Sequence, residues 1–197
     1  MVQRLPPIAL SVRQPSAWAI IHGGKDIENR SLGSIRAGNM GLGRIAIHAA
    51  IGMKQAEYEY LLWRWARDGV RVPRPEDLPR RAIIGSVDVV EIVTESDSPW
   101  FGGEAGLRLA NPKPCDPIPA PGALGYFKWA AGGDLAPALP WMMGYDRPGG
   151  DGATGSCYPI SGQASRRRHG NRSAIPSEDH IIGSVASQLT SVFSGKA

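Results

Sequence analysis

The stretch "GGKDIENRS" concentrates side chains that can do chemistry in one short segment. Two glycines are followed by Lys25, Asp26, Glu28 and Arg30. In an extended segment Ile27 points to the side opposite its neighbours, so the two acids and Arg30 share one side when Ile27 enters the core. A carboxylate beside an arginine stays ionised, and each group fixes the geometry of the other. The spacing therefore predicts a charged cluster at this corner.

The chemistry expected of the cluster centres on Lys25. Two preceding glycines let this side chain project into a cleft with little steric cost. A desolvated lysine can lose its proton near neutral pH and act as a general base, or stay cationic and stabilise an oxyanion. Glu28 can position a water molecule or accept a hydrogen bond from the exocyclic amine of a base. A solvated turn for Lys25, and a structural ion pair between Glu28 and Arg30, are the alternatives.

Three further side chains are candidates for contact with a base. Gln14 and Trp18 precede the corner and can read a base edge or stack on it. Trp100, in "SPWF", can form an aromatic cleft wall on which a base stacks, an interaction worth about 1–3 kcal/mol. A place in the core is the alternative for both tryptophans.

Metal and cofactor sites are not indicated. The two cysteines, Cys115 and Cys157, form no CxxC pair, which argues against a zinc site or a disulfide framework. His48 has no second His, Cys or acid at metal-ligand spacing. We therefore expect neither a metal nor another cofactor.

The composition is typical of a globular domain with or without a tail. The chain has 197 residues, 42% of them hydrophobic, and a formal net charge of +4. Such a surface tolerates polyanions, although net charge alone is weak support for nucleic-acid binding. The N-terminal stretch has no long apolar run, and no stretch approaches the roughly 20 apolar residues that span a bilayer. We expect a soluble, cytoplasmic protein without a membrane partner.

The chain changes character near residue 131. Residues 1–131 alternate periodic apolar segments with turns, whereas residues 132–197 are rich in Gly, Pro, Ser and Arg. Such a segment buries too little apolar surface to offset its ordering entropy, so we expect a largely disordered tail. Within it, "WMM" (141–143) is expected to dock on the domain, "SRRRHGNRS" is either a solvated tail or an aid in holding RNA phosphates, and "IIGSVASQLTSVF" is a short helix or strand.

The elements expected in residues 1–131 indicate an α+β protein. Short strands or extended segments are expected at 8–12, 26–30, 44–50, 82–93, 106–110 and 123–129, and helices at 17–22 and 52–69. In the longer helix the 3.6-residue period places Tyr58, Leu61, Leu62 and Trp65 on one side and Met53, Tyr60 and Trp63 on the other. The proline-rich connection 112–121 is expected to be a loop or a sheet edge. Together these elements predict a small β-barrel with helices packed on it.

Several segments, in this order, resemble the ASCH domain family, which is related to PUA domains. They are "LSVRQPSAWAIIHGGKDIENRS", "GRIAIHAA", "AIIGSVDVVEIV", "SPWFGG" and "LRLANPKPCDPIPAPGALGYFKW", covering about residues 6–130. The resemblance implies a PUA-like open β-barrel of five or six short strands with two or three flanking helices. It also implies a cleft beside the Gly-Lys corner that binds RNA or a modified nucleobase or nucleoside. Some members are hydrolases and others are binding modules.

The resemblance implies roles for individual residues. In members that deacylate N4-acetylcytidine the corner reads Gly-x-Lys-Thr-x-Thr-x-Arg, which Lys25 and Arg30 match, while Asp26 and Glu28 occupy the threonine positions. The hydroxyl nucleophile is therefore missing. RNA-cleaving members are more similar at the corner and carry a serine in a later loop, for which Ser98 is the candidate. Lys25, Glu28 and Ser98 are the expected catalytic residues; the expected base-binding residues are Gln14, Trp18, Arg30 and Trp100.

The sequence leaves several functions open. The first is an RNA-binding or modified-nucleoside-binding protein with hydrolytic activity, ribonuclease-like or, less well matched, an amidohydrolase on N4-acylated cytidine. The second is a reader of RNA, or of DNA, without turnover. The third is an interaction domain that recruits a partner protein through the aromatic helix, residues 53–67. The base, the preference between RNA and DNA, and the oligomeric state are left open as well.

Overall fold

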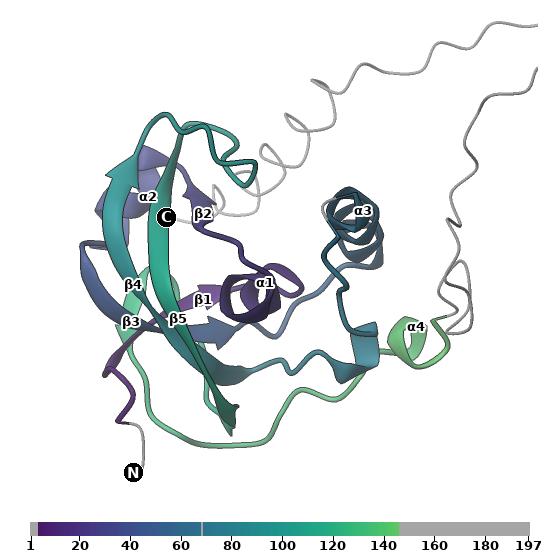
Figure 1. Cartoon of the computed structure of the whole chain (residues 1–197). Coiled ribbons are helices and arrows are strands. Elements are labelled where there is room, and N and C mark those ends of the chain that lie inside the picture. Colours follow the sequence, from purple (N-terminus) through teal and green to yellow (C-terminus); the bar gives the residue numbers. More distant parts are fainter. Residues whose placement is uncertain (1–3, 68, 146–197) are drawn as a thin grey trace, which may run out of the picture. The chain divides into compact units, whose positions relative to one another are not determined.

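The computed structural model describes residues 4–67 and 69–145 (Figure 1). The strands are β1 (Ile8–Val12), β2 (Ile27–Arg30), β3 (Gly43–Ala49), β4 (Ala82–Val93), β5 (Ala105–Pro119) and β6 (Tyr126–Lys128). The helices are α1 (Ser16–His22), α2 (Leu32–Ala37), α3 (Gln55–Ala66) and α4 (Pro140–Met143), with a 3₁₀ turn, η1, at Pro75–Asp77. None of the helices in these residues combines the length and apolar character needed to cross a bilayer.

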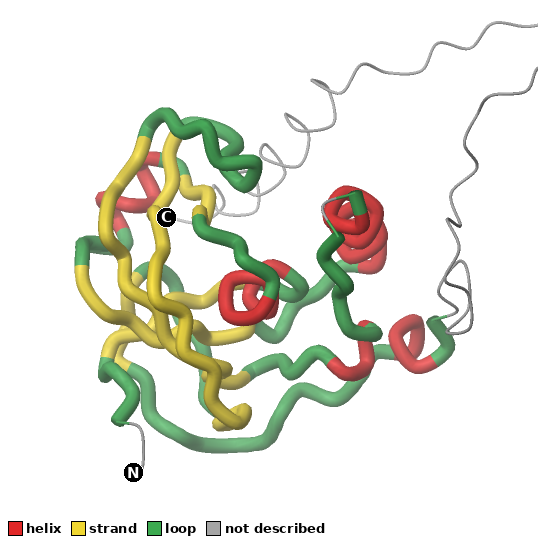
Figure 2. The backbone as a smooth tube through the Cα atoms, viewed as in Figure 1, coloured by secondary structure: helices red, strands yellow, loops and turns green. Residues whose placement is uncertain are grey.

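The strands form one mixed sheet that curls into a half-barrel (Figure 2). Its order is β2-β5-β4-β3-β1-β6; β1 and β3 run parallel, and the other neighbours are antiparallel. Register shifts occur once between β3 and β4 and repeatedly between β4 and β5. Such irregularities bend and twist a sheet, which is what a curled sheet requires. The predicted α+β class is confirmed.

Helix α1 lies between two hydrophobic cores. Ala17, Ile20 and Ile21 pack in the core on the concave side of the sheet. Ala19 belongs to a second core, which α1 shares with α3, η1 and α4. Helix α1 therefore packs against both layers of the protein.

The turn after α1 directs the chain into β2. Gly23 and Lys25 both donate their backbone N–H to the carbonyl of Ala19, at 2.8 and 3.0 Å. Gly24 has φ +72°, a left-handed conformation that glycine adopts without the steric penalty of a Cβ atom. The predicted end of the helix at these glycines is confirmed, and the turn brings Lys25 back against the helix it follows.

Helix α3 has the two faces that its periodicity predicts. Tyr58, Leu62 and Trp65 are buried in the second core. Tyr60 and Trp63, on the other face, are exposed. Met53 precedes the helix and is buried as well, so it does not share the exposed face predicted for it.

The compact unit continues beyond the predicted boundary at residue 131 and runs to Tyr145. Gly132 N–H donates to the carbonyl of Pro119 at 2.8 Å, and Met142 and Tyr145 are buried in the second core. The predicted docking of "WMM" is confirmed for Met142, whereas Met143 is exposed. The remainder of the predicted tail, with "SRRRHGNRS" and "IIGSVASQLTSVF", lies outside the described residues.

The proline-rich segment lies at an edge of the sheet, one of its two predicted places. It forms the second half of β5, whose residues from Leu109 to Pro119 pair with β4 alone. Proline has no backbone N–H, and at a sheet edge no neighbouring strand requires that donor. Helix α2 was not predicted; it begins after Ser31, whose hydroxyl accepts a hydrogen bond from Ser34 N–H at 3.1 Å.

Candidate functional site

The charged corner forms a buried chain of ion pairs. Ile27 is fully buried, and the side chains of Lys25 and Glu28 are only 7% and 11% exposed. The ammonium of Lys25 donates to the carbonyl of Ile27 and lies 3.1 Å from Glu28 Oε2. Glu28 Oε1 lies 3.1 Å from an NH2 nitrogen of Arg30. The structure thus brings three of the predicted site residues into contact.

Two cations decide the charge state of Glu28. Burial alone would raise the pKa of this carboxyl, but Lys25 and Arg30 outweigh it, so the pKa lies below its ordinary value. Lys25 in turn has two acceptors, a carbonyl and an ionised carboxylate. Lys25 Nζ is thus held by two acceptors inside the fold.

Arg30 has an unused donor within this cluster. Its NH2 nitrogen also donates to the carbonyl of Ser11 at 2.8 Å. Within the part of the chain that the structure describes, its Nε atom is buried and has no hydrogen-bond partner. A buried donor left unpaired costs about 1–3 kcal/mol. A quarter of the Arg30 side chain is exposed, so a ligand can contact the guanidinium at its exposed atoms, while the Nε atom itself is buried.

A second acid and a second arginine adjoin the cluster, and the sequence did not point to either. Arg13 NH1 lies 3.7 Å from Glu57 Oε2, in the first turn of α3. Burial raises the pKa of Glu57, and the negative charge of Glu28 raises it further, against the attraction of Arg13 and Lys54. Glu57 thus forms an ion pair with Arg13, which follows β1. One available signal was its position next to Tyr58, at the border of the buried face of α3.

The predicted serine is linked to the corner by Asp26. Ser98 Oγ donates to Asp26 Oδ1 at 2.5 Å and accepts from the backbone N–H of Trp100 at 3.2 Å. Asn29 holds the same loop, since its side chain donates to the carbonyl of Trp100 at 2.8 Å and accepts from Gly102 N–H at 2.9 Å. Asp26, just before β2, and Asn29, within β2, therefore both hold the loop that carries Ser98.

Of the four predicted base-binding residues only Arg30 lies in the charged cluster, and the other three have partners elsewhere in the protein. Gln14 is fully buried; its amide donates to the carbonyl of Pro79 at 2.8 Å and accepts from Trp18 N–H at 3.0 Å. Trp18 is half-buried in the second core. Trp100 is half-buried too, and its ring meets that of Trp65 edge to face at 5.1 Å. Trp18 and Trp100 remain partly exposed, whereas Gln14 is fully buried.

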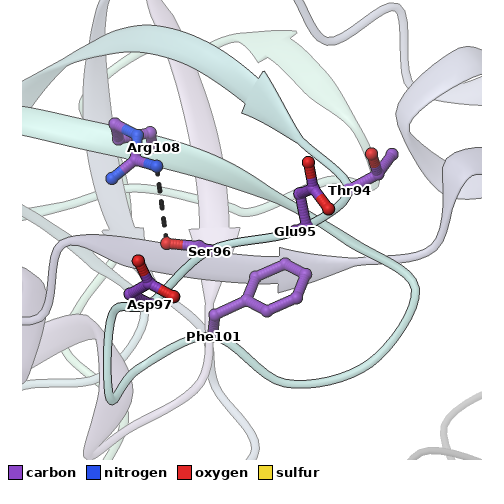
Figure 3. A pocket seen from close by; sticks show the side chains of 6 residues that line it. All are labelled: Thr94, Glu95, Ser96, Asp97, Phe101 and Arg108. Atoms are coloured by element: carbon purple, nitrogen blue, oxygen red, sulfur yellow. Dashed lines mark hydrogen bonds between the residues drawn. The ribbon is translucent and has the colours of Figure 1, made fainter.

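An open depression lies on the other side of the Ser98 loop (Figure 3). Its volume is about 630 Å³, within the range of small-molecule sites. Arg108 donates to Ser96 Oγ at 3.4 Å, as Figure 3 shows, and Ser96 Oγ accepts from Ser98 N–H at 3.1 Å. The lining combines acids, hydroxyls, one arginine and one aromatic ring: Thr94, Glu95, Ser96, Asp97, Phe101 and Arg108.

Metal ligands do not gather in residues 4–67 and 69–145, where no group of three His, Cys, Asp or Glu side chains is placed to hold an ion. His48 illustrates this. Its Nε2 is 3.0 Å from the carbonyl of Ala120 and its Nδ1 is 3.0 Å from Ser11 Oγ. Both ring nitrogens are therefore engaged inside the protein.

Comparison with known proteins gives no family for this chain. A scan against protein-family models finds no match, and a search of curated proteins finds no similar one.

Proposed function

We propose that this chain is a PUA-like domain of the ASCH type that binds RNA or a modified nucleoside at the cluster of Lys25, Glu28 and Arg30. The observation that carries the proposal is the ion-pair chain in which Glu28 joins Lys25 to Arg30, whose side chain is a quarter exposed. Arginine donors match phosphate and base acceptors well, and lysine supplies a point charge beside them. The resemblance of the corner and of the segments that follow it adds support.

The charges around the cluster favour an anionic ligand. Three cations, Arg13, Lys25 and Arg30, surround two carboxylates, Glu28 and Glu57. The raised pKa of Glu57 means that its negative charge is lost at a higher pH than usual. Mildly acidic solution therefore makes the site more positive, and we expect affinity for a phosphate-bearing ligand to rise there.

Hydrolysis of RNA is a second candidate function, and the hydroxyl of Ser98 favours it. Asp26 accepts the hydroxyl proton of Ser98 in a short hydrogen bond, which orients the oxygen lone pairs away from the carboxylate. Lys25 and Arg30 could stabilise negative charge on a phosphate, and Glu57, with its raised pKa, is suited to proton transfer. Binding without turnover needs none of these steps, so it is the primary proposal.

A binding assay with matched variants tests the proposal. We expect Lys25→Met to weaken binding of a labelled single-stranded RNA or a nucleoside monophosphate by about tenfold, because a charge-assisted contact is lost. Arg36→Met, which removes an exposed charge from α2, is the control for net charge. Equal affinities for the two variants, with both folded by thermal melting, would overturn the site.

The same preparations address turnover. Incubation of the RNA with wild-type protein and with Ser98→Ala, followed by denaturing electrophoresis, detects cleavage. Products that depend on Ser98 support the hydrolase, and intact RNA in both lanes leaves binding as the function.

A further inference from the structure

The outward face of α3 carries large rings that the core does not use. Tyr60 and Trp63 are 36% and 39% exposed, although Tyr58, Leu62 and Trp65 of the same helix are buried. In Figure 1, α3 stands on the far side of α1 from the sheet, so its outward face is not covered by a strand. Exposed aromatic side chains that adjoin one another indicate a contact surface.

These rings form a continuous stripe with an arginine. The ring centroids of Tyr60 and Trp63 are 6.4 Å apart with an interplanar angle of 36°. The guanidinium of Arg67 lies over the Trp63 ring at 5.5 Å from its centroid. Positions i, i+3 and i+7 lie along one face of a helix, so the three side chains follow its axis. We call Tyr60, Trp63 and Arg67 the α3 stripe.

Two more arginines lie near the C-terminal end of the α3 stripe. Arg64 lies next to Tyr60 on the helix surface, and Arg71 is exposed just beyond the helix. Rings interleaved with guanidinium groups match single-stranded nucleic acid, whose bases stack on rings and whose phosphates attract arginines. Tyr, Trp and Arg are also enriched in protein–protein interfaces, so a protein partner is the alternative that the test below distinguishes.

The α3 stripe adjoins the proposed site through its own helix. Glu57, one turn before Tyr60, forms an ion pair with Arg13, and the negative charge of Glu28 contributes to its raised pKa. Arg64, one turn after Tyr60, lies 3.4 Å from the carbonyl of Pro99, the residue that follows Ser98. One edge of α3 thus borders Arg13 and the Ser98 loop, which Asp26 and Asn29 link to the charged corner, and the rings lie on the adjacent column of side chains.

We propose that the α3 stripe is a stacking platform for unpaired nucleotides that flank the nucleotide held at the cluster of Lys25, Glu28 and Arg30. This inference rests on the proposed function and narrows its ligand class. The ligand is a single-stranded oligonucleotide several nucleotides long, rather than a free nucleoside. Stacking tolerates any base, so the platform contributes affinity and length dependence without reading sequence.

The test compares ligands of different length on matched variants. Fluorescence anisotropy measures binding of a labelled single-stranded RNA decamer, and competition with that label measures binding of a nucleoside monophosphate. We expect Trp63→Ala to weaken decamer binding by about tenfold and to leave the mononucleotide unchanged. Trp63→Phe, which keeps a ring, should recover most of the affinity. Leu124→Ala, at another exposed apolar residue, should change neither.

The outcomes separate the platform from the site. A decamer affinity unchanged by Trp63→Ala, while Lys25→Met weakens it, overturns the platform and keeps the proposed function. A loss with Trp63→Ala but none with Lys25→Met keeps the platform as a binding surface and overturns the site. If Trp63→Ala leaves RNA binding intact but dissociates an oligomer in light scattering, the face contacts protein and the platform is overturned.

Discussion

At the scale of single residues, Glu28 holds the cluster together because it neutralises two cations at once. Its two oxygens lie 3.1 Å from Lys25 and 3.1 Å from Arg30. The carboxylate is buried, so its removal leaves two positive charges close together in a medium that screens them poorly. Ligand binding can draw on this arrangement only while Glu28 is ionised and in place.

Replacing Glu28 by glutamine should therefore be costly. We expect Glu28→Gln to lower the free energy of unfolding by about 3 kcal/mol, measured by chemical denaturation at neutral pH. Glu91→Gln is the matched control: Glu91 also pairs with an arginine, Arg108 at 2.8 Å, but is 57% exposed. An exposed pair contributes about 0–1 kcal/mol. Similar losses in both variants would show that Glu28 does not hold the cluster.

The sign of the pH dependence follows from the lowered pKa of Glu28. A carboxyl whose pKa is lowered by folding stabilises the protein above its unfolded-state pKa, near 4.5. That contribution is lost as the pH falls through the folded-state value. Glu57, whose pKa is raised, acts in the opposite direction. Glu28→Gln should accordingly lose less stability than the wild type between neutral pH and pH values below 4.5.

At the scale of elements, the turn between α1 and β2 positions Lys25. Its geometry depends on the left-handed Gly24, whose absent Cβ would meet no atom within 4 Å. Glycine is therefore favoured at position 24 by the left-handed backbone conformation and not by a lack of room for a side chain. We expect Gly24→Ala to cost about 1–2 kcal/mol of stability, and to weaken ligand binding because Lys25 follows directly.

Gly52→Ala is the control for the turn. A Cβ atom added to Gly52 would also meet no atom within 4 Å, but the φ of Gly52 is not in the left-handed region. Denaturation and binding titrations on the two variants decide the matter. A stable Gly24→Ala with wild-type affinity would show that the turn does not position the site.

Elements with a strong local pattern were predictable, and elements made by distant contacts were not. The β-branched run of β4 and the two faces of α3 follow from periodicity alone. The short α2 has no such pattern, and the continuation of the compact unit to Tyr145 depends on a core assembled from distant segments. In the site, the contacts of Lys25, Glu28 and Arg30 arise from neighbours along the chain. The Arg13–Glu57 pair and the Asp26–Ser98 bond join residues far apart in sequence, which spacing cannot reveal.

At the scale of the whole molecule, residues 132–145 help to fasten the helical layer that borders the site. Met142 is fully buried in the second core, which includes residues of α3. The rings of Tyr145 and Tyr58 pack edge to face, with their centroids 5.2 Å apart. Since α3 carries both Glu57 and the α3 stripe, the position of this layer decides whether site and platform face one ligand. The C-terminal part of the compact unit is thus part of the functional architecture that we propose.

Two adjacent methionines offer a test of this role. We expect Met142→Ala to lower the free energy of unfolding by about 2–5 kcal/mol, because it opens a cavity in the second core. Met143 is 72% exposed, so Met143→Ala should change stability by less than about 0.5 kcal/mol. Equal, small effects in thermal and chemical denaturation would mean that residues 132–145 do not stabilise the helical layer.

The affinity of Arg30→Lys for single-stranded RNA tests the central claim most directly. Lysine keeps the positive charge but removes the planar guanidinium, with its several donors, that Arg30 partly exposes. We predict that a titration by fluorescence anisotropy shows about tenfold weaker binding for Arg30→Lys than for the wild type, with Arg36→Lys unchanged. Wild-type affinity in a folded Arg30→Lys protein would contradict the account.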